Sequence, residues 1–275
     1  MTCSPDQGMG GYPRVDSVEI LMSVSASGWH GGRMTTTGGT GPGSGGSAWA
    51  GEAIVTTCVI VALLPLGFLH IDGIGAVDPL HDVISDYVFR PGGYALLGIA
   101  ALSLAVATVV LATGLRAAGL PGSRMPALLL GSVAVAFVLV AVFPTHAPGA
   151  SAGLVSTVHR AAGGWVFAVL PPAVWMVARR ARAAPAWQPA APALSRLAGV
   201  TAVLSAFFLL SHIPIVIAGS PGFPLIGGVQ RVVFASVMLV LVATARATRL
   251  AVDRALEPAI LSGSELPDPR LQGAA

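Results

Sequence analysis

Six long apolar runs, separated by short polar segments, dominate the hydropathy pattern of this 275-residue chain. Each run holds roughly 20 residues, and an α-helix of that length crosses a hydrocarbon core of roughly 30 Å. A soluble chain of this size would instead form helices of about 11–12 residues around a core. The pattern therefore predicts an all-α polytopic integral membrane protein with six transmembrane helices, over residues 54–69, 94–115, 125–143, 155–177, 197–218 and 228–247.

Composition supports this prediction and narrows the class of partner. The chain is 54% hydrophobic and only 10% charged, whereas a soluble domain carries about 25% charged residues. All 15 basic residues are arginines, and they lie in short loops and tails with no basic stripe interleaved with aromatic residues. That distribution argues against a nucleic-acid partner. The expected partners are membrane lipids.

The arginines also predict the orientation of the chain. Three arginines, Arg90, Arg160 and Arg231, lie on one side of the predicted membrane. Nine lie on the other side: Arg116, Arg124, Arg179, Arg180, Arg182, Arg196, Arg246, Arg249 and Arg254. Because cytoplasmic loops carry the excess of positive charge, both termini are expected in the cytoplasm. Richness in arginine without lysine is typical of a GC-rich bacterial genome, so we expect a multi-pass protein of the inner (plasma) membrane.

The predicted transmembrane domain, residues 48–250, is flanked by two tails of different composition. Residues 1–47 are rich in glycine, serine and threonine, with GGTGPGSGG at 38–46. Residues 251–275 contain Pro258, Pro267 and Pro269 and show no packed pattern. Such segments bury too little apolar surface to fold alone, so both tails are expected to be flexible and cytoplasmic.

Spacing within the apolar runs suggests where helices approach closely. Small residues recur every four positions at Ala198, Ala202 and Ala206, and at Gly164 and Ala168. Such spacing predicts close helix–helix seams, although an alanine-rich composition alone would also produce it.

The first loop on the outer side, residues 70–93, contains a predicted short amphipathic helix. It begins at Asp78, an N-cap residue followed by proline. Apolar side chains recur at helical spacing on one face, and polar ones occupy the opposite arc. The apolar face is Leu80, Val83, Ile84 and Tyr87, and the polar arc is Asp78, His81, Asp82, Ser85 and Asp86.

Charge pairing predicts a polar cap at this outer face. No acidic residue occurs between Asp86 and Asp253, while Arg160 and Arg231 open the fourth and sixth spans. A cation near hydrocarbon is costly unless it pairs or reaches water. We therefore expect Asp82 or Asp86 to lie within ion-pair reach of Arg160 or Arg231, with His159 nearby. A lipid phosphate is the alternative partner, because the arginine fork suits phosphate.

The candidate site residues at this cap are His81, Asp82, Ser85, Asp86, His146, His159, Arg160 and Arg231. Three interpretations remain open: a structural cap that ties helix ends together, a pocket for a small ligand or lipid headgroup, and a metal-dependent hydrolase. Histidine and aspartate are the ligands that zinc uses when it activates water. A Ser–His–Asp triad through Ser85 is disfavoured because the chain has no GxSxG elbow. Neither a catalytic residue nor a cofactor is assigned.

Four short motifs in this order resemble a bacterial and archaeal membrane family, domain of unknown function 998. The motifs are Asp78-Pro79 with Ile84-Ser85-Asp86, Phe143-Pro144-Thr145-His146, Val158-His159-Arg160, and Gly227-Gly228-Val229-Gln230-Arg231. The resemblance covers about residues 54–247 and implies a six-span fold, but no activity. Members of that family typically carry an acidic residue where this chain has His146, so the resemblance implies no carboxylate-dependent role at that position.

Overall fold

The computed structural model describes residues 44–147, 151, 153–218 and 223–263, and these form six long α-helices and two short 3-10 helices. The described residues contain no strand, which confirms the all-α prediction. Most of the predicted N-terminal tail lies outside the described residues. In chain order the helices are α1 Ser44–Asp72, η1 Ile84–Phe89, α2 Gly93–Ala117, α3 Arg124–Val142, α4 Leu154–Ala181, η2 Gln188–Ala190, α5 Ala191–Ala218 and α6 Ile226–Gly263.

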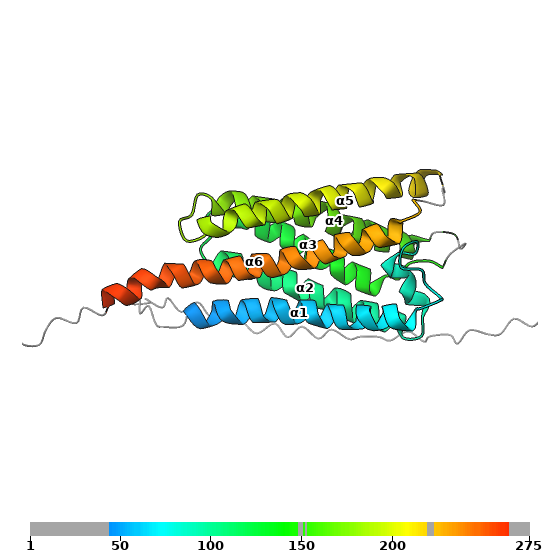
Figure 1. Cartoon of the computed structure of the whole chain (residues 1–275), viewed down its shortest axis with the longest axis horizontal. Helices are drawn as coiled ribbons and strands as arrows, with labels where there is room; N and C mark the ends of the chain where they lie inside the picture. Colours follow the sequence, from blue (N-terminus) through cyan, green and yellow to red (C-terminus); the bar gives the residue numbers. More distant parts are fainter. Residues whose placement is uncertain (1–43, 148–150, 152, 219–222, 264–275) are drawn as a thin grey trace, which may run out of the picture. The chain divides into compact units, whose positions relative to one another are not determined.

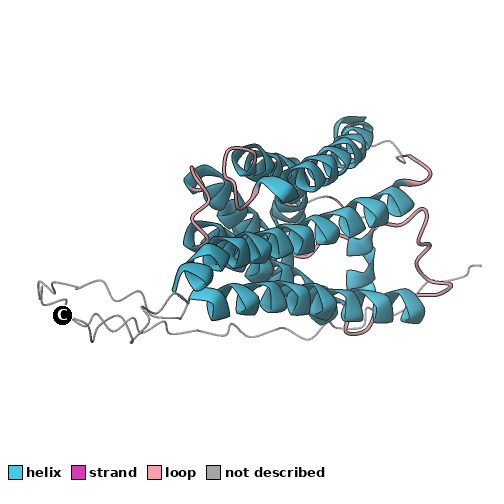
Figure 2. Ribbon diagram, turned by 60° about the vertical axis from the view of Figure 1, so that its left-hand side comes forward, coloured by secondary structure: helices cyan, strands magenta, loops and turns pink. Residues whose placement is uncertain are grey.

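The six α-helices form a bundle in which each helix packs against the next along the chain, and α6 closes the ring against α1. Helix α6 also contacts α2 and α4. The connecting segments gather at the two ends of the bundle (Figures 1 and 2). We call one end the cap end, which holds residues 73–92, Phe143 and the start of α6. The other is the basic end, with residues 118–123, 182–190 and the last turns of α6.

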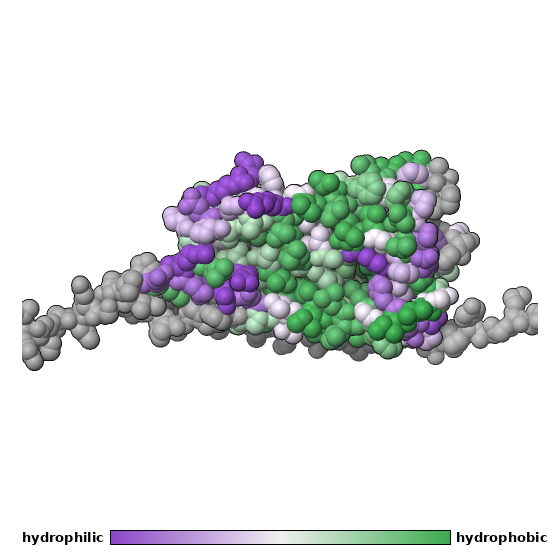
Figure 3. All heavy atoms as spheres, in the orientation of Figure 1, coloured by the Kyte–Doolittle hydropathy of each residue, from purple (hydrophilic) through white to green (hydrophobic). Residues whose placement is uncertain are grey.

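The surface of the bundle is that of a membrane protein. All six helices are long and apolar enough to cross a membrane. Large apolar side chains such as Leu64, Val203 and Leu210 point outward in mid-helix, with 67%, 70% and 63% of their surface exposed. On the face seen in Figure 3, hydrophobic residues occupy the middle and hydrophilic residues gather towards both ends. Such a surface is favourable in lipid and costly in water.

The inward faces of the helices are built mainly from alanine, valine and leucine. The alanines among them let helices approach closely, which matters in lipid because burial from water no longer drives helix association. On α5 the buried stripe is Ala198, Thr201, Ser205 and Phe208. Ala202, Ala206 and, on α4, Ala168 are exposed, so the predicted seams through them are wrong. Alanine is tolerated equally against lipid, and its spacing alone does not identify the packed face.

Helix α6 has 38 residues and is therefore roughly 57 Å long, more than a bilayer core requires. It continues to Gly263, beyond residue 250, where the sequence pattern predicted a flexible tail. At the basic end Arg249 forms an ion pair with Glu52 of α1 at 2.7 Å. Arg254 donates to the backbone carbonyl of Ala186 at 3.1 Å. These contacts tie the end of α6 to α1 and to the α4–α5 connection.

Candidate functional site

The loop between α1 and α2 contains two short turns separated by an extended residue. Asp78 starts the first turn, because its side chain accepts the backbone N–H of Leu80 at 2.8 Å and its carbonyl accepts that of Asp82 at 2.8 Å. Val83 is then extended, so the helix predicted from Asp78 to Tyr87 is interrupted there. The short helix in this loop is the 3-10 helix η1. Aspartate side chains bind nearby backbone groups in competition with α-helical bonding, which explains the difference.

The first turn of α6 is the platform on which this loop docks. Gly228 donates its backbone N–H to the carbonyl of Leu80 at 3.0 Å. The side-chain oxygen of Gln230 accepts the backbone N–H of Ile84 at 2.6 Å. A Cβ atom on Gly227 would overlap the carbonyl oxygen of Asp82. Glycine at 227 therefore permits the close approach of loop and helix.

Arg231 is the centre of the contacts between the loop and α6. Its Nε donates to Nε2 of His70 at 2.8 Å, and its Nη1 donates to the carbonyl of Asp82 at 2.8 Å and to that of Gly227 at 3.0 Å. Its Nη2 donates to the Tyr87 hydroxyl at 3.3 Å, and the guanidinium lies 5.7 Å from the centre of the Tyr87 ring. The guanidinium thus clamps the end of α1, the loop and η1 onto α6.

The contacts of His70 determine its tautomer. Its Nδ1 lies 2.7 Å from the carbonyl oxygen of Leu66, which can only accept a hydrogen bond. Nδ1 therefore carries the proton. Arginine has no acceptor, so Nε2 of His70 accepts from Arg231 through its lone pair. His70 is neutral in this arrangement.

The predicted ion pair of Asp82 or Asp86 with Arg160 or Arg231 is wrong. Among the described residues, no carboxylate lies within 4.0 Å of the Arg231 or Arg160 guanidinium. Arg231 instead uses the backbone carbonyl of Asp82, while the Asp82 carboxylate accepts the backbone N–H of Asp78 at 2.7 Å. Neutral acceptors satisfy the guanidinium without a partner carboxylate. Arg160 lies exposed on α4.

Asp86 is a half-buried carboxylate next to this clamp. Burial raises the pKa of its carboxyl above the usual range, and the negative charge of Asp82 adds to the effect. The backbone N–H of Val83, which donates to Asp86 at 3.1 Å, and the charges of Arg231 and His146 act in the opposite direction. His146 is therefore close enough to interact electrostatically with Asp86. Its Nδ1 is buried and has no hydrogen-bond partner among the described residues.

His81 lies on the exposed surface of the loop. Its Nδ1 lies 2.8 Å from the Asp78 carboxylate, and both side chains are more than half exposed. Hydrogen bonds from Leu80 and His81 hold the pKa of Asp78 below its usual range. In the part of the chain that the structure describes, no three histidine, cysteine or acidic residues are grouped to hold a metal ion. The convergence of metal ligands on which the hydrolase interpretation depended is thus not found there.

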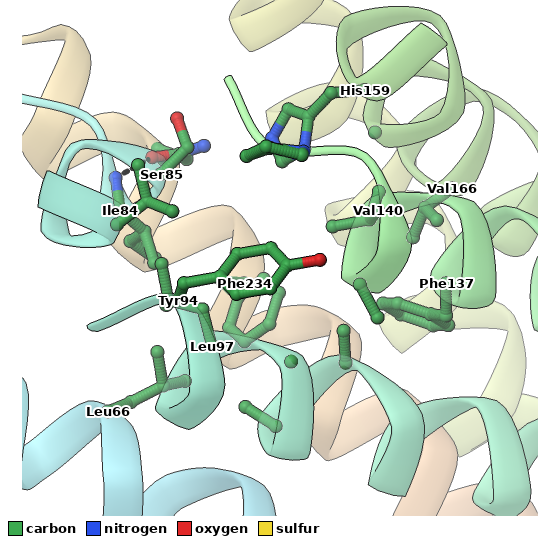
Figure 4. Close-up of a pocket in the computed structure, with 18 of the residues that line it drawn as sticks. Leu66, Ile84, Ser85, Tyr94, Leu97, Phe137, Val140, His159, Val166 and Phe234 are labelled. Atoms are coloured by element: carbon green, nitrogen blue, oxygen red, sulfur yellow. Dashed lines mark hydrogen bonds between the residues drawn. The ribbon is translucent and has the colours of Figure 1, made fainter. Parts of the chain in front are cut away.

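A pocket of about 110 Å³ lies at the cap end, lined by residues of α1, η1, α2, α3, α4 and α6. Its walls are mostly apolar and include Leu66, Leu97, Phe137, Val166 and Phe234 (Figure 4). Four polar side chains line it: Ser85, Tyr94, His159 and Gln230. Figure 4 shows the Tyr94 hydroxyl and the His159 ring turned into the pocket from different helices. Each of these polar side chains comes from a different element.

Two of the polar lining residues are held by the backbone. The Tyr94 hydroxyl donates to the carbonyl of Val142 at 3.0 Å, and Nδ1 of His159 donates to the carbonyl of Phe143 at 2.7 Å. Both bonds tie a pocket residue to the end of α3. Within the described ranges, the Ser85 hydroxyl and the Gln230 amide nitrogen form no hydrogen bond. The pocket therefore combines fixed polar groups with two that are available to a ligand.

The predicted site residues thus divide into three groups. Ser85 and His159 line the pocket; Asp82, Asp86, Arg231 and His146 belong to the clamp or its surroundings; His81 and Arg160 are exposed. Sequence reasoning assigned no role to Tyr94, Gln230 or His70. Tyr94 and Gln230 are polar residues in the first turn of a span, and that position is a signal that could have identified both.

The sequence model of one protein family matches residues 56–247, and the description of that family is "Protein of unknown function (DUF998)". The match includes every residue that lines the pocket and the whole Arg231 clamp. No curated protein and no solved structure matches the chain.

Proposed function

Because the chain belongs to the family of domain of unknown function 998, which carries no activity in its description, we propose from the chain's own geometry that this multi-pass membrane protein binds a small amphipathic molecule in the cap-end pocket. A cavity of about 110 Å³ would hold the first few carbons of the ligand, against the walls between α2, α3, α4 and α6, because a cavity of about 150 Å³ holds a molecule the size of benzene. The rest of the apolar chain would extend past the exposed Tyr94 into the surrounding lipid. The polar end of the ligand would lie against Ser85, Gln230 and Tyr94.

The observation that carries this proposal is the composition of the pocket. Ligand sites in proteins are mostly apolar cavities with a few polar groups that fix the orientation of the ligand. This pocket has that composition, with four polar residues among predominantly apolar ones. Its polar groups come from η1, α2, α4 and α6, so one ligand would contact elements that are far apart in the sequence.

Access would be from the cap end. Tyr94 lines the pocket and is 48% exposed, and Ser85 is half-buried. A ligand with an apolar chain could enter from the lipid–water interface, where such molecules concentrate. The arginine distribution predicts that this end faces the cell exterior. In that orientation, the protein would take its ligand from the outer leaflet or from the outer solution.

Two glycines offer a matched test of the pocket. Gly163 lines the pocket on α4, and a Cβ atom there would meet nothing within 4 Å. Leucine at 163 should therefore fit the backbone and fill the cavity. Gly131 on α3 is also half-buried with nothing within 4 Å of a Cβ atom, but it does not line the pocket. Both substitutions replace a helical glycine, so their effects on helix propensity are similar.

The measurement is mass spectrometry of small molecules that remain bound to the protein after purification in detergent. We expect the wild-type chain and Gly131→Leu to retain the same molecule in stoichiometric amount, and Gly163→Leu to lose at least nine-tenths of it. Equal retention by Gly163→Leu and the wild type would refute the pocket as the site. A molecule lost equally in both variants would also contradict the proposal, because the loss would not depend on the pocket.

A further inference from the structure

The pocket contains no charged partner for a charged ligand. None of its lining residues is an aspartate, glutamate, lysine or arginine, and its titratable side chains are Tyr94 and His159. A charge moved from water into an apolar cavity loses its hydration, and only a nearby counter-charge or several hydrogen bonds can replace it. The walls of this pocket therefore offer no fixed counter-charge, and His159 is the one lining side chain that could gain a positive charge, by protonation of Nε2.

Three charged groups at the cap end already have partners, and Arg160, a fourth, is exposed and does not line the pocket. Arg231 donates four hydrogen bonds to groups of the protein. Arg90 lies 3.2 Å from the Asp72 carboxylate, and Asp86 accepts the backbone N–H of Val83. A phosphate or carboxylate that entered the pocket would have to break the Arg231 contacts to gain a cation. Those contacts hold the loop on α6, so the exchange would disrupt the cap.

The polar groups that remain available are neutral and suit an uncharged oxygen. The Gln230 amide oxygen is occupied by Ile84, so its NH₂ group is left as a donor. The Ser85 hydroxyl can donate and accept, and the Tyr94 hydroxyl, which donates to Val142, can still accept. A ligand hydroxyl can accept from Gln230 and donate to Ser85 or Tyr94. A ligand carbonyl can accept from both Gln230 and Ser85.

Building on the proposed function, we propose that the ligand of this pocket is an amphiphile with an uncharged polar end, a hydroxyl or an amide or ester carbonyl, attached to an apolar chain. Long-chain alcohols and neutral lipids belong to this class, whereas phospholipids and fatty acids do not. The class follows from the charge-free lining together with the unused Ser85 and Gln230 groups.

The test is a competition among four molecules with the same ten-carbon chain: decanol, decanamide, decyl phosphate and decylamine. The full-length protein in detergent is mixed with equal concentrations of all four, and bound species are counted by native mass spectrometry. We expect decanol and decanamide to be bound in at least tenfold excess over the two charged molecules. Ser85→Ala should weaken binding of both uncharged molecules several-fold, because one hydrogen bond is lost. Arg160→Gln should leave it unchanged.

Three results would overturn the inference, and they can be told apart. If decyl phosphate binds most tightly, Gly163→Leu blocks it and Arg160→Gln weakens it, the pocket is a site for anionic headgroups and only the uncharged class is wrong. If decylamine is the preferred ligand, the uncharged ligand class is likewise refuted, but the pocket remains the binding site. If Gly163→Leu changes the binding of none of the four molecules while Gly131→Leu behaves identically, the proposed function fails with it.

Discussion

Replacement of Arg231 by methionine should destabilise the folded protein strongly. Methionine keeps much of the apolar length of the side chain but removes every donor. The substitution would remove four hydrogen bonds, to Nε2 of His70, the carbonyls of Asp82 and Gly227, and the hydroxyl of Tyr87. Of these acceptors, the Gly227 carbonyl keeps the backbone bond of helix α6. The contacts join α1, the first loop and η1 to α6, so the loss should be felt by the whole cap end.

The size of the effect follows from the number and kind of bonds lost. A hydrogen bond to a charged group contributes about 1.5–3 kcal/mol, but bonds made by one side chain are not additive. Arg231 is only half-buried, so water can replace part of what is lost. We therefore expect a loss of about 3 kcal/mol in the free energy of unfolding, about the contribution of one or two such bonds.

The assay is unfolding by sodium dodecyl sulfate in mixed micelles, followed by the fluorescence of the five tryptophans. Arg160→Met is the matched control, because Arg160 also lies at the cap end of a helix but is exposed and forms no ion pair with any described residue. We expect that variant to change the free energy of unfolding by less than about 0.5 kcal/mol, as is usual for surface substitutions.

A double-mutant cycle separates the clamp from a general effect of removing charge. His70→Leu removes the acceptor of the Arg231 Nε bond, and contacting pairs show interaction energies of about 0.5–3 kcal/mol. We expect His70→Leu and Arg231→Met to couple by at least about 1 kcal/mol. Equal losses for Arg160→Met and Arg231→Met, or additive effects of His70→Leu and Arg231→Met, would refute the clamp.

Three further predictions concern the loop, its carboxylates and the orientation. Gly227→Ala should lower the free energy of unfolding by about 1–3 kcal/mol, because the added Cβ atom would overlap the Asp82 carbonyl. Gly228→Ala is the control and should change stability little in the same unfolding assay, because the Gly228 Cβ position is 3.4 Å from the nearest atom. The raised pKa of Asp86 means that the folded protein binds this proton more tightly than the unfolded chain, so the contribution of Asp86 to stability is fully present below the ordinary carboxyl pKa of 3.8 and is lost as the pH rises through the raised value. A pH series of unfolding curves should show this loss removed by Asp86→Asn. Asp78→Asn, at a carboxyl with a lowered pKa, should instead remove stability that the wild type loses on acidification. Reporter fusions after Arg182 and Arg249 should report the cytoplasm and a fusion near Gly149 the exterior; a cytoplasmic signal near Gly149 would overturn the predicted topology.

The sequence alone was sufficient for the architecture. A membrane span needs about 20 apolar residues in succession, and six such runs can be recognised in the sequence without any knowledge of packing. Because the helices alternate in direction, the segments that carry Asp86 and Phe143 and the start of α6, which carries Arg231, had to lie at one end of the bundle. The polar cap was predicted from the charges at that end; the ion pairs expected there do not form among the described residues, but Ser85 and His159 line one pocket there. The sequence motif around Gly227 was also recognised, but the close approach of the first loop to this glycine was not predicted.

Only the tertiary structure decided which groups within the cap meet. Arg231 is bound by two backbone carbonyls, a neutral histidine and a tyrosine rather than by a carboxylate. Because every residue type has a backbone carbonyl, no sequence pattern identifies which carbonyls will bind an arginine. On α5, Thr201 is buried and the next residue, Ala202, is exposed. Which of the two faces the core depends on the rotation of α5 about its own axis, and the neighbouring helices set that rotation. The pocket needs side chains from six elements at distances set by packing. Length and hydrophobicity act locally along a chain and can be read from it, whereas hydrogen-bond partners and cavities depend on positions in space that only the assembled bundle defines.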